Sequence, residues 1–553
     1  MLKKSVIQYA LISIIAALLF VPFLGEVHLF DWDELNFAEA AREMLVTGDW
    51  LTVKIDYQPF HEKPPFFIWM QAISMSIFGV SEFSARLPNA LMGIITLLIL
   101  FRIGKNLFDD KFGMLWALVY LGSFLPHFYF KSAIIDPYFN FFMFTSMYYL
   151  SKAAYISIHA PTLSNYRYII IAGVLNSFAV LTKGPVGFLL VFLTWMLFWI
   201  VNRKDYIFPL VDMILFSAIS FTPIVIWYLV VFTGTDGAII GEFISYQIRL
   251  LTTGDAGHSQ PIYYHFLVIF FGCFPATAFI FGSLQKRAED GTAQSTFKLW
   301  NFILLAVVLV VFSIVKTKII HYSSLAYFPV TFLAAYSLHK YIYRKDRMTT
   351  VPKVIVAVIG LLYAAAFIGF PLLMKNIDLY LDKVTDEFTK ALLLTDVSWG
   401  YEYIIGIIYA CIVLLSLIFF RKDILRAAFV LFGGTAVTIL IFLTLLAPKI
   451  EPYTQGAPIE FFKSLQGEDA YIHVLGYKSY AHYFYARMRP EQSAHVIGIS
   501  PEDWERWLLE GFIDKPVYFV SHNKRAERYL ENYHIEELYR KSGFVFMRRL
   551  PKK

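Results

Sequence analysis

Long apolar runs recur along most of this chain, and they constrain its fold more than any other feature. Each has the roughly 17–25 residues that an α-helix needs to cross a lipid bilayer. Lipid offers no hydrogen-bond partners to the backbone, so such runs must fold as helices or closed barrels. We expect helical spans at residues 5–24, 86–106, 112–130, 134–158, 166–182, 185–201, 209–232, 262–283, 298–315, 319–341, 353–374, 401–420 and 426–446. The predicted fold class is a polytopic α-helical membrane protein with about 13 transmembrane helices.

Composition supports this class and excludes others. Of the 553 residues, 58% are hydrophobic and 16% are charged, whereas soluble domains have about 45–50% and about 25%. A soluble or disordered chain is therefore excluded. Two cysteines, both inside apolar runs, exclude a disulfide framework. The net charge of +6 does not predict a nucleic-acid partner, because the basic residues gather at the ends of the apolar runs.

One short apolar segment, residues 64–80, decides the orientation of everything after it. If it does not cross the membrane, the connections on the side of the N-terminus carry most of the Lys and Arg, as cytoplasmic loops do. If it crosses, the basic loops around 202–205 and 340–347 fall outside. We therefore expect an uncleaved first span with a cytoplasmic N-terminus, and a segment 64–80 that lies in the membrane interface.

The composition changes after residue 446. In residues 447–553, 30 of 107 residues are charged, which predicts a water-soluble domain. Short β-like runs alternate with helix-like runs there, as in a small α/β layer. The β-like runs are 471–477, 495–500 and 516–522, and the helix-like runs are 501–511 and 524–533. We expect a membrane domain at 1–446 and a soluble α/β domain at 447–553, which 13 spans place outside the cytoplasm.

Polar residues gather at the outer ends of the predicted spans. The first outer loop, about 25–85, is the richest part, and it carries Asp31 and the pair Asp33–Glu34 just after the first span. The run Glu34–Met44 is helix-like, with an apolar face of Phe37, Ala40, Ala41 and Met44. By the same parity the outer side also receives Glu62, Lys63, Asp136, Lys183, Arg249, His258, Lys316, Lys318 and His321.

Each of these residues also has a purely structural interpretation. Acidic residues at a helix start usually cap it or interact with its dipole, which applies to Asp31, Asp33 and Asp136. Lysines at a membrane rim usually anchor the chain to the headgroups, which applies to Lys183 and Lys318. Isolated histidines such as His61 and His127 are more often satisfied polar residues than ligands. What favours a functional site is that all these groups share one depth at one face.

The loop motifs resemble those of a known family. DWDELNFAEAAREMLVTGDWL, HEKPPFFIW and ARLPNALMG are similar to the N-terminal third of the aminoarabinose transferases. These belong to the protein-O-mannosyltransferase-like branch of the C-type integral-membrane glycosyltransferases. The family motifs match here at Asp33–Glu34, Glu62–Pro65, Asp136, Lys183–Pro185 and His258 before Pro261–Tyr264. Where the family often has Arg-Tyr after its Asp-Glu-x, this chain has Asn36–Phe37, so the motif does not identify the sugar.

The resemblance and the residues agree on a glycosyltransferase with a membrane-borne donor. No nucleotide-binding motif is present, and the outer side has no supply of nucleotide sugars, so we expect a polyprenyl-phosphate sugar. Its phosphate needs cations, for which Lys63, Arg249 and Lys183 are candidates. The resemblance also implies that Glu62 and His258 hold a divalent metal ion, although two ligands are too few for a tight site.

The catalytic candidates are Asp33, Glu34 and Asp136, with Asp33 at the reacting centre. A hydroxyl acceptor would need a base there. A phosphate acceptor is mostly ionised already, so Asp33 would then orient groups or stabilise an oxocarbenium-like sugar. The expected acceptor is a lipid A-type glycolipid, another envelope glycan or a protein, at the bacterial inner membrane.

Two other functional classes are weighed against this one. A transporter or flippase of lipid-linked sugars would also use charged residues, but near the middle of the bilayer and often in broken helices. Here the interiors of the spans hold almost no ionisable groups. An intramembrane protease lacks support, because His61–Glu62 is followed by Lys-Pro-Pro and not by a second histidine on a helix.

Overall fold

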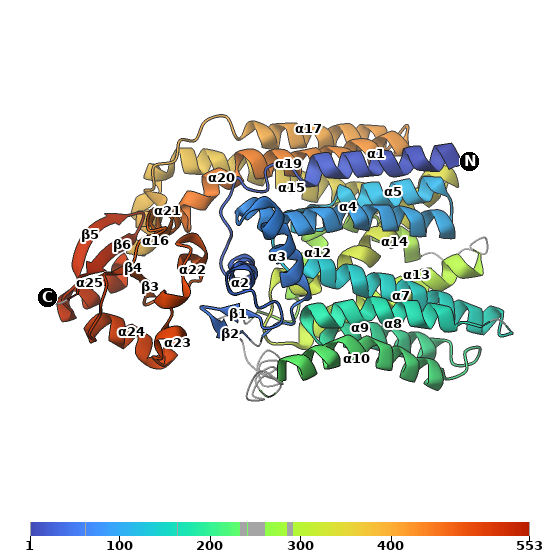
Figure 1. Ribbon diagram of the computed structural model, residues 1–553. Helices are drawn as coiled ribbons and strands as arrows, with labels where there is room; N and C mark the ends of the chain where they lie inside the picture. Colours follow the sequence, from blue (N-terminus) through green and yellow to red (C-terminus); the bar gives the residue numbers. More distant parts are fainter. Residues whose placement is uncertain are drawn as a thin grey trace.

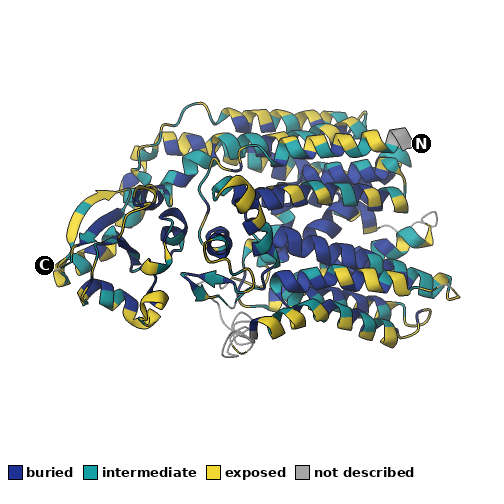
Figure 2. Cartoon of the chain, in the orientation of Figure 1, coloured by how far each residue is buried: buried dark blue, intermediate teal, exposed yellow. Residues whose placement is uncertain are grey.

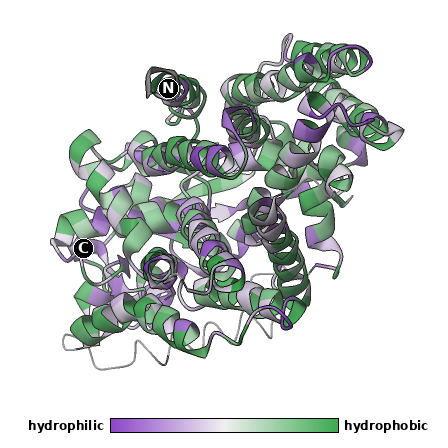
Figure 3. Ribbon diagram, turned by 90° about the vertical axis from the view of Figure 1, so that its right-hand side faces the viewer, coloured by the Kyte–Doolittle hydropathy of each residue, from purple (hydrophilic) through white to green (hydrophobic). Residues whose placement is uncertain are grey.

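The computed structural model describes residues 2–60, 62–162, 164–232, 241, 260–284 and 291–551. A body of roughly parallel helices forms one part of the molecule, and a smaller unit with a β-sheet forms the other (Figure 1). The N-terminus lies at the end of the helical body that points away from the sheet. Seen from that end, hydrophobic residues cover most of the helices (Figure 3), as expected of a body that sits in lipid.

The helices of the body coincide with the predicted spans. They are α1 (Leu2–Phe20), α4 (Glu82–Leu107), α5 (Asp110–Leu121), α7 (Asp136–His159), α8 (Tyr166–Lys183), α9 (Val186–Val201), α10 (Leu210–Phe232), α13 (Thr292–Ile314), α14 (Tyr327–Tyr343), α15 (Thr350–Lys375), α17 (Ile404–Phe419), α18 (Ile424–Ala428) and α19 (Gly434–Leu445). By length and composition, five of the described helical segments suffice to cross a membrane, and up to seven do if each of two bent pairs counts as one span. The number of 13 spans stays a prediction.

Two predicted spans are bent rather than continuous. The helix α5 turns by 85° into α6 (Phe124–Phe128) and the short 3-10 segment 129–131, and α12 (Tyr264–Gly272) turns by 105° into the 3-10 segment 276–284. Pro275 lacks a backbone N–H and disfavours a helical conformation at Phe274, which ends α12. The two breaks meet, because the Phe124 N–H donates to the Phe274 carbonyl at 3.0 Å. The sequence pattern missed both bends because apolar residues continue through them.

The first outer loop folds into α2 (Asp33–Thr47), the strands β1 (Lys54–Ile55) and β2 (Gln58–Pro59), and α3 (Phe66–Phe78). The helix α3 has 13 residues, about 20 Å at 1.5 Å per residue, which is short of the roughly 30 Å of the hydrocarbon core. Its Ile73, Ile77 and Phe78 are exposed. This length suits the prediction that residues 64–80 lie in the membrane interface, which stays a prediction.

Helix α2 is not the amphipathic helix that its sequence predicts. Every residue from Glu34 to Met44 is buried, including the charged Glu39, Arg42 and Glu43. The reason is its position, because α2 lies between the helical body and the C-terminal unit and is covered from both sides (Figures 1 and 2). Its polar face contacts protein: Arg42 donates to Glu39 through two nitrogens, at 2.6 and 2.7 Å, and to the Met488 carbonyl at 2.9 Å.

The C-terminal unit contains a four-stranded sheet in the order β3-β4-β6-β5. The strands are β3 (Tyr471–Leu475), β4 (Val517–His522), β5 (Glu536–Lys541) and β6 (Phe544–Arg549). Strands β3 and β4 are parallel, while β4–β6 and β6–β5 are antiparallel. The helices of this unit are α16 (Glu387–Leu393), α20 (Ala447–Ile450), α21 (Gly456–Ser464), α22 (Ala481–Tyr485), α23 (Ala494–Ile497), α24 (Pro501–Glu510) and α25 (Asn523–Asn532).

The structure of this unit differs from the sequence prediction in three places. The predicted strand at 495–500 is wrong: the segment holds α23, which Gly498 ends in the left-handed region at φ 84°. The hairpin β5–β6 was missed because β5 is rich in charges, whereas its turn residues Ser542 and Gly543 have the positive φ that such a turn requires. Helix α16 precedes residue 447 yet packs on the sheet, with Phe388 stacked on His522 at 4.1 Å between ring centroids.

The C-terminal unit shares a hydrophobic core with the first outer loop. Apolar residues of α2 and α3 pack in one cluster with residues of α21, β3, α22, β4 and β6. Polar contacts add to this, because Tyr57 donates to the Met488 carbonyl at 2.7 Å and His28 lies 2.8 Å from Glu451. The C-terminal unit is thus fixed against the end of the helical body, where the predicted functional residues lie.

Candidate active site

A cavity of about 660 Å³ lies where the helical body meets the C-terminal unit. It is lined by polar groups from the start of α2, the loop before α3, the start of α7, the end of α8, the segment before α14 and the loop before α22. Those groups are Asp31, Asp33, Glu34, Asn36, Glu62, Lys63, Asp136, Lys183, Thr317, His321, Tyr322 and Lys478. Segments far apart in the sequence thus supply carboxylates and cations to one space.

A chain of charged groups crosses this cavity. His321 Nε2 lies 3.1 Å from Asp33 Oδ2 and 3.8 Å from Asp136 Oδ2. Lys183 Nζ donates to the other oxygen of Asp136 at 2.8 Å. Asp33 keeps 38% of its side-chain surface exposed, whereas Asp136 keeps 4%. Asp33 is therefore the carboxylate that a bound molecule can reach, and Asp136 holds His321 and Lys183 in place.

The local sequence explains these positions. Asp136 is the first residue of α7, and Pro137 after it suits the first turn of a helix, where no N–H partner is needed. Lys183 is the last residue of α8, and Gly184 follows at φ 87°, a conformation that glycine allows. Neither Asp33 nor Asp136 caps its helix through its side chain. Both carboxylates are therefore available for other contacts.

The charges around Asp33 keep it ionised. Burial alone would raise the pKa of its carboxyl, but the hydrogen bond with His321 and the charges of His321 and two lysines outweigh it. The pKa of Asp33 falls to about 2. The two lysines are Lys63 and Lys183. At physiological pH this cavity therefore presents a fixed negative charge, and Asp33 is a weak base.

Lys63 is placed by the proline break that follows it. Pro64 and Pro65 are buried, and α3 begins directly after them at Phe66. Burial lowers the pKa of Lys63, and the charges of Glu62 and Asp33 oppose that shift. The ammonium group thus lies in a cavity where an additional anion would favour its charged form.

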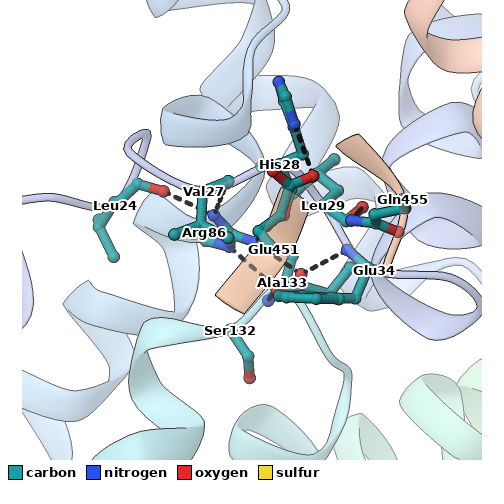
Figure 4. A network of polar contacts seen from close by, with 12 residues as sticks. Leu24, Val27, His28, Leu29, Glu34, Arg86, Ser132, Ala133, Glu451 and Gln455 are labelled. Carbon is teal, nitrogen blue, oxygen red and sulfur yellow. Dashed lines mark hydrogen bonds and ion pairs between the residues drawn. The ribbon is translucent and has the colours of Figure 1, made fainter. Parts of the chain in front are cut away.

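Glu34 lies beside the cavity but is fully engaged in holding the structure together (Figure 4). Arg86 donates to both of its carboxylate oxygens, at 2.9 and 2.7 Å. The backbone N–H groups of Ala133 and Phe30 donate to the same two oxygens at 2.6 and 3.0 Å. Arg86 in turn donates to the carbonyls of Leu24, Val27 and His28. Glu34 thus ties α2 to α4 and to the segment before α7, and so sets the spacing between Asp33 and Asp136.

A second, apolar cavity lies nearby in the helical body. Its volume is about 450 Å³, and its lining comes from α6, α12, α15, α19 and the 3-10 segment Ile320–Ala326. The lining residues are Phe124, Leu125, Phe128, Val268, Phe271, Gly272, Ile320, Tyr363, Phe367, Ile439 and Phe442. Ile320 precedes His321 in the sequence, so the apolar cavity and the charged cavity are neighbours along the chain.

Comparisons with known proteins bear on this arrangement. The family model described as dolichyl-phosphate-mannose-protein mannosyltransferase matches residues 62–227. The undecaprenyl phosphate-alpha-4-amino-4-deoxy-L-arabinose arabinosyl transferase of Wigglesworthia glossinidia brevipalpis is 24% identical over 363 residues, which are 65% of this chain and 63% of that protein. An uncharacterized protein of Aquifex aeolicus is 29% identical over 340 residues, 60% of this chain and 73% of that one.

A solved structure extends the similarity to the whole fold. ArnT from Cupriavidus metallidurans, crystallised bound to undecaprenyl phosphate, superimposes with a TM-score of 0.74 at 18% identity and covers 98% of this chain and 97% of that one. Residues 62–227 thus match the mannosyltransferase family model, and the whole chain has the fold of this solved structure. The sequence matches span 63% and 60% of the length of two of its curated relatives.

The structure brings together most of the predicted site residues. Asp33, Glu34, Glu62, Lys63, Asp136 and Lys183 all line the one cavity. Arg249, His258 and His61 lie outside the described residues. Lys318 is buried and donates to the Val315 carbonyl at 2.7 Å, just beyond the end of α13. His127 is buried away from the site and lies 2.8 Å from the Leu121 carbonyl.

His321 and Lys478 line the cavity, but the sequence assigned no role to either of them. His321 was expected on the outer side, in the cluster KTKIIHYSS, but only the fold shows that it joins Asp33 to Asp136. Lys478 lies in the C-terminal unit, and no local motif distinguishes it from the other lysines there. The signal that could identify such residues is the same residue type at these positions in an alignment of related sequences.

Proposed function

We propose that this chain is a membrane glycosyltransferase that moves a sugar from a polyprenyl-phosphate donor to an acceptor at the outer face of the bacterial inner membrane. The observation that carries the proposal is the charged cavity, in which an ionised, accessible Asp33 lies among cationic side chains. The apolar cavity beside it suits a prenyl chain. Relatives of this chain are named undecaprenyl phosphate-alpha-4-amino-4-deoxy-L-arabinose arabinosyl transferases, and undecaprenyl phosphate is bound in a structure of the same fold.

The reaction breaks the bond between the sugar C1 and the donor phosphate oxygen and forms a bond from C1 to the acceptor oxygen. The bonding electrons leave with the phosphate, whose charge grows in the transition state. Lys63 is proposed to hold that phosphate, together with Arg249, because a fixed cation there favours bond breaking. Lys183 was a further candidate, but its ion pair with Asp136 suits a role in positioning Asp136.

The low pKa of Asp33 bears on the nature of the acceptor. A general base works best with a pKa near the working pH, and a carboxylate with a pKa of about 2 is far from that. Such a carboxylate is suited to stabilising positive charge on the sugar as it becomes oxocarbenium-like. We therefore favour an acceptor that arrives already ionised, such as a phosphate on a glycolipid, over a protein hydroxyl.

Glu34 and Asp136 are proposed to act through other groups. Asp136 orients His321 and Lys183, and Glu34 fixes the start of α2 through Arg86. A metal ion at Glu62 and His258 remains a sequence prediction. Within the residues that the structure describes, no group of three or more His, Cys, Asp or Glu side chains has an arrangement that could hold a metal ion. No step of the proposed reaction is therefore assigned to a metal.

The proposed topology follows the sequence. Residues 1–446 form the membrane domain with 13 spans, and residues 447–553 form an α/β domain in the periplasm. The four-stranded sheet with its flanking helices supports the second part. The position of the N-terminus, at the opposite end of the helical body from that sheet, supports the odd number of spans (Figure 1).

Transfer by the reconstituted protein tests the function. Purified protein in lipid nanodiscs is given an undecaprenyl-phosphate sugar and a phosphorylated glycolipid, and the product is measured by mass spectrometry. Asp33→Asn should lower the transfer rate by about 10²–10³-fold, because it removes a preorganised charge at nearly constant shape. Asp378→Asn, an exposed residue beyond α15, is the matched control. Full activity of Asp33→Asn, or transfer from a soluble nucleotide sugar, would contradict the proposal.

A further inference from the structure

Lys478 is the one residue of the C-terminal unit that lines the charged cavity within the described part of the chain. It lies in the loop between β3 and α22. The other polar groups around the cavity come from the helical body and its first outer loop. Lys478 therefore approaches from the side of the cavity that faces away from the membrane.

The loop that carries Lys478 is held in place from both sides. Asp31 accepts a hydrogen bond from the Ser479 hydroxyl and another from the Tyr480 N–H, the latter at 3.1 Å. The Ser479 hydroxyl also accepts from the Ala481 N–H at the start of α22. Asp31, two residues before Asp33, thus fixes the lysine loop to the reacting centre.

The ammonium group of Lys478 rests on aromatic rings. Its Nζ lies 4.5 Å from the centroid of the Trp32 ring and 5.3 Å from that of Tyr480. Such contacts hold a cation in position without neutralising its charge. Among the described residues, no carboxylate forms an ion pair with Lys478, unlike Lys183, which is paired with Asp136. Lys478 thus presents its ammonium group to a ligand.

The two substrates approach from different sides. A prenyl chain must lie among the membrane helices, so the donor phosphate enters from the side of Lys63, directly before α3. We propose that Lys478 binds an anionic group, a phosphate, on the headgroup of the acceptor, which faces the aqueous side, and that Asp31 positions Lys478 for this. This inference rests on the proposed function, because it assigns the second substrate of the same site.

Direct binding separates this role from the donor site. Two probes are used with the detergent-solubilised full chain: undecaprenyl phosphate, and a lipid A preparation with or without its phosphates. Lys478→Gln should weaken binding of the phosphorylated glycolipid at least fivefold and leave undecaprenyl phosphate within twofold of wild type. Lys478→Arg should restore most of the affinity, since the charge is kept. Lys524→Gln, an exposed lysine of the same unit, should bind both probes as wild type does.

The outcomes are distinct for the two proposals. Equal binding of the glycolipid with and without phosphates, or unchanged glycolipid binding by Lys478→Gln, would overturn the role of Lys478. A loss of undecaprenyl phosphate binding in Lys478→Gln would assign the lysine to the donor and would also overturn it. Unchanged undecaprenyl phosphate binding by Lys63→Gln would instead remove the proposed donor site, whatever Lys478 does.

Discussion

The buried pair Glu34–Arg86 offers the sharpest test of which carboxylate does chemistry and which holds the site together. Glu34 is 6% exposed and Arg86 is 5% exposed, and four N–H groups donate to the two oxygens of Glu34. Glu34→Gln keeps the shape, but its amide nitrogen must face at least one of those donors. It also leaves the Arg86 charge without its counterion.

Removing one partner of a buried ion pair costs about 3–5 kcal/mol. Arg86 keeps its three backbone carbonyl acceptors, so we expect the lower part of that range, about 3 kcal/mol, for Glu34→Gln. The free energy of unfolding is measured in mixed micelles with increasing SDS. Glu26→Gln, which changes an exposed glutamate in the same loop, should leave it within about 0.5 kcal/mol.

A double variant completes the test. Glu34→Gln with Arg86→Met removes both charges, so it should be less destabilised than the sum of the two single variants. Transfer activity should fall in parallel with stability, because Glu34 acts by fixing the positions of Asp33 and Asp136. If Glu34→Gln keeps wild-type stability and yet loses transfer, Glu34 belongs at the reacting centre and the positioning role is refuted.

Three further predictions follow from other contacts. His321→Ala removes the hydrogen bond that keeps the pKa of Asp33 low. In a profile of transfer rate against pH, the loss of activity on the acidic side should therefore begin at a higher pH than in the wild type. An unchanged profile would contradict this. Burial raises the pKa of Asp56 to about 7, so its ionised form is disfavoured in the folded protein. The free energy of unfolding should therefore fall as the pH rises from about 4 to 7. In Asp56→Asn the free energy of unfolding should depend less on pH over that range. A Cβ on Gly122 would lie 2.2 Å from the Phe432 carbonyl oxygen, so Gly122→Ala should lower the free energy of unfolding by about 1–3 kcal/mol. A Cβ on Gly433 would meet nothing within 4 Å, so Gly433→Ala should lower it by less than about 1 kcal/mol in the same assay.

The positions of the helices were determined largely by local sequence. An apolar run of sufficient length has one stable solution in lipid, so each predicted span coincides with helical structure. The local sequence does not show where such a run is broken. The bends after Leu121 and Gly272 keep the apolar character on both sides, and their partners lie far away in the sequence, as Phe124 and Phe274 do.

The candidate site was predicted in part, because charged residues at one depth are visible in the sequence. Asp33, Asp136, Lys63 and Lys183 were expected on the outer side and do line one cavity. The division of roles among them was not visible. Glu34 and Asp33 are neighbours in the chain, yet one faces Arg86 and the other faces the cavity, because successive residues of a helix point about 100° apart.

What only the tertiary structure decided is which distant residues meet. His321 lies 288 residues after Asp33 and Lys478 lies 445 after it (321 − 33 and 478 − 33), and their positions depend on how the helices pack and where the C-terminal unit docks. The same docking buries α2 on all sides, against its amphipathic pattern. The hydrophobicity and length of an apolar segment are properties of that segment alone, so the sequence by itself determined the membrane helices. Contacts between segments depend on the packing of the whole chain, so they were decided only in the folded protein.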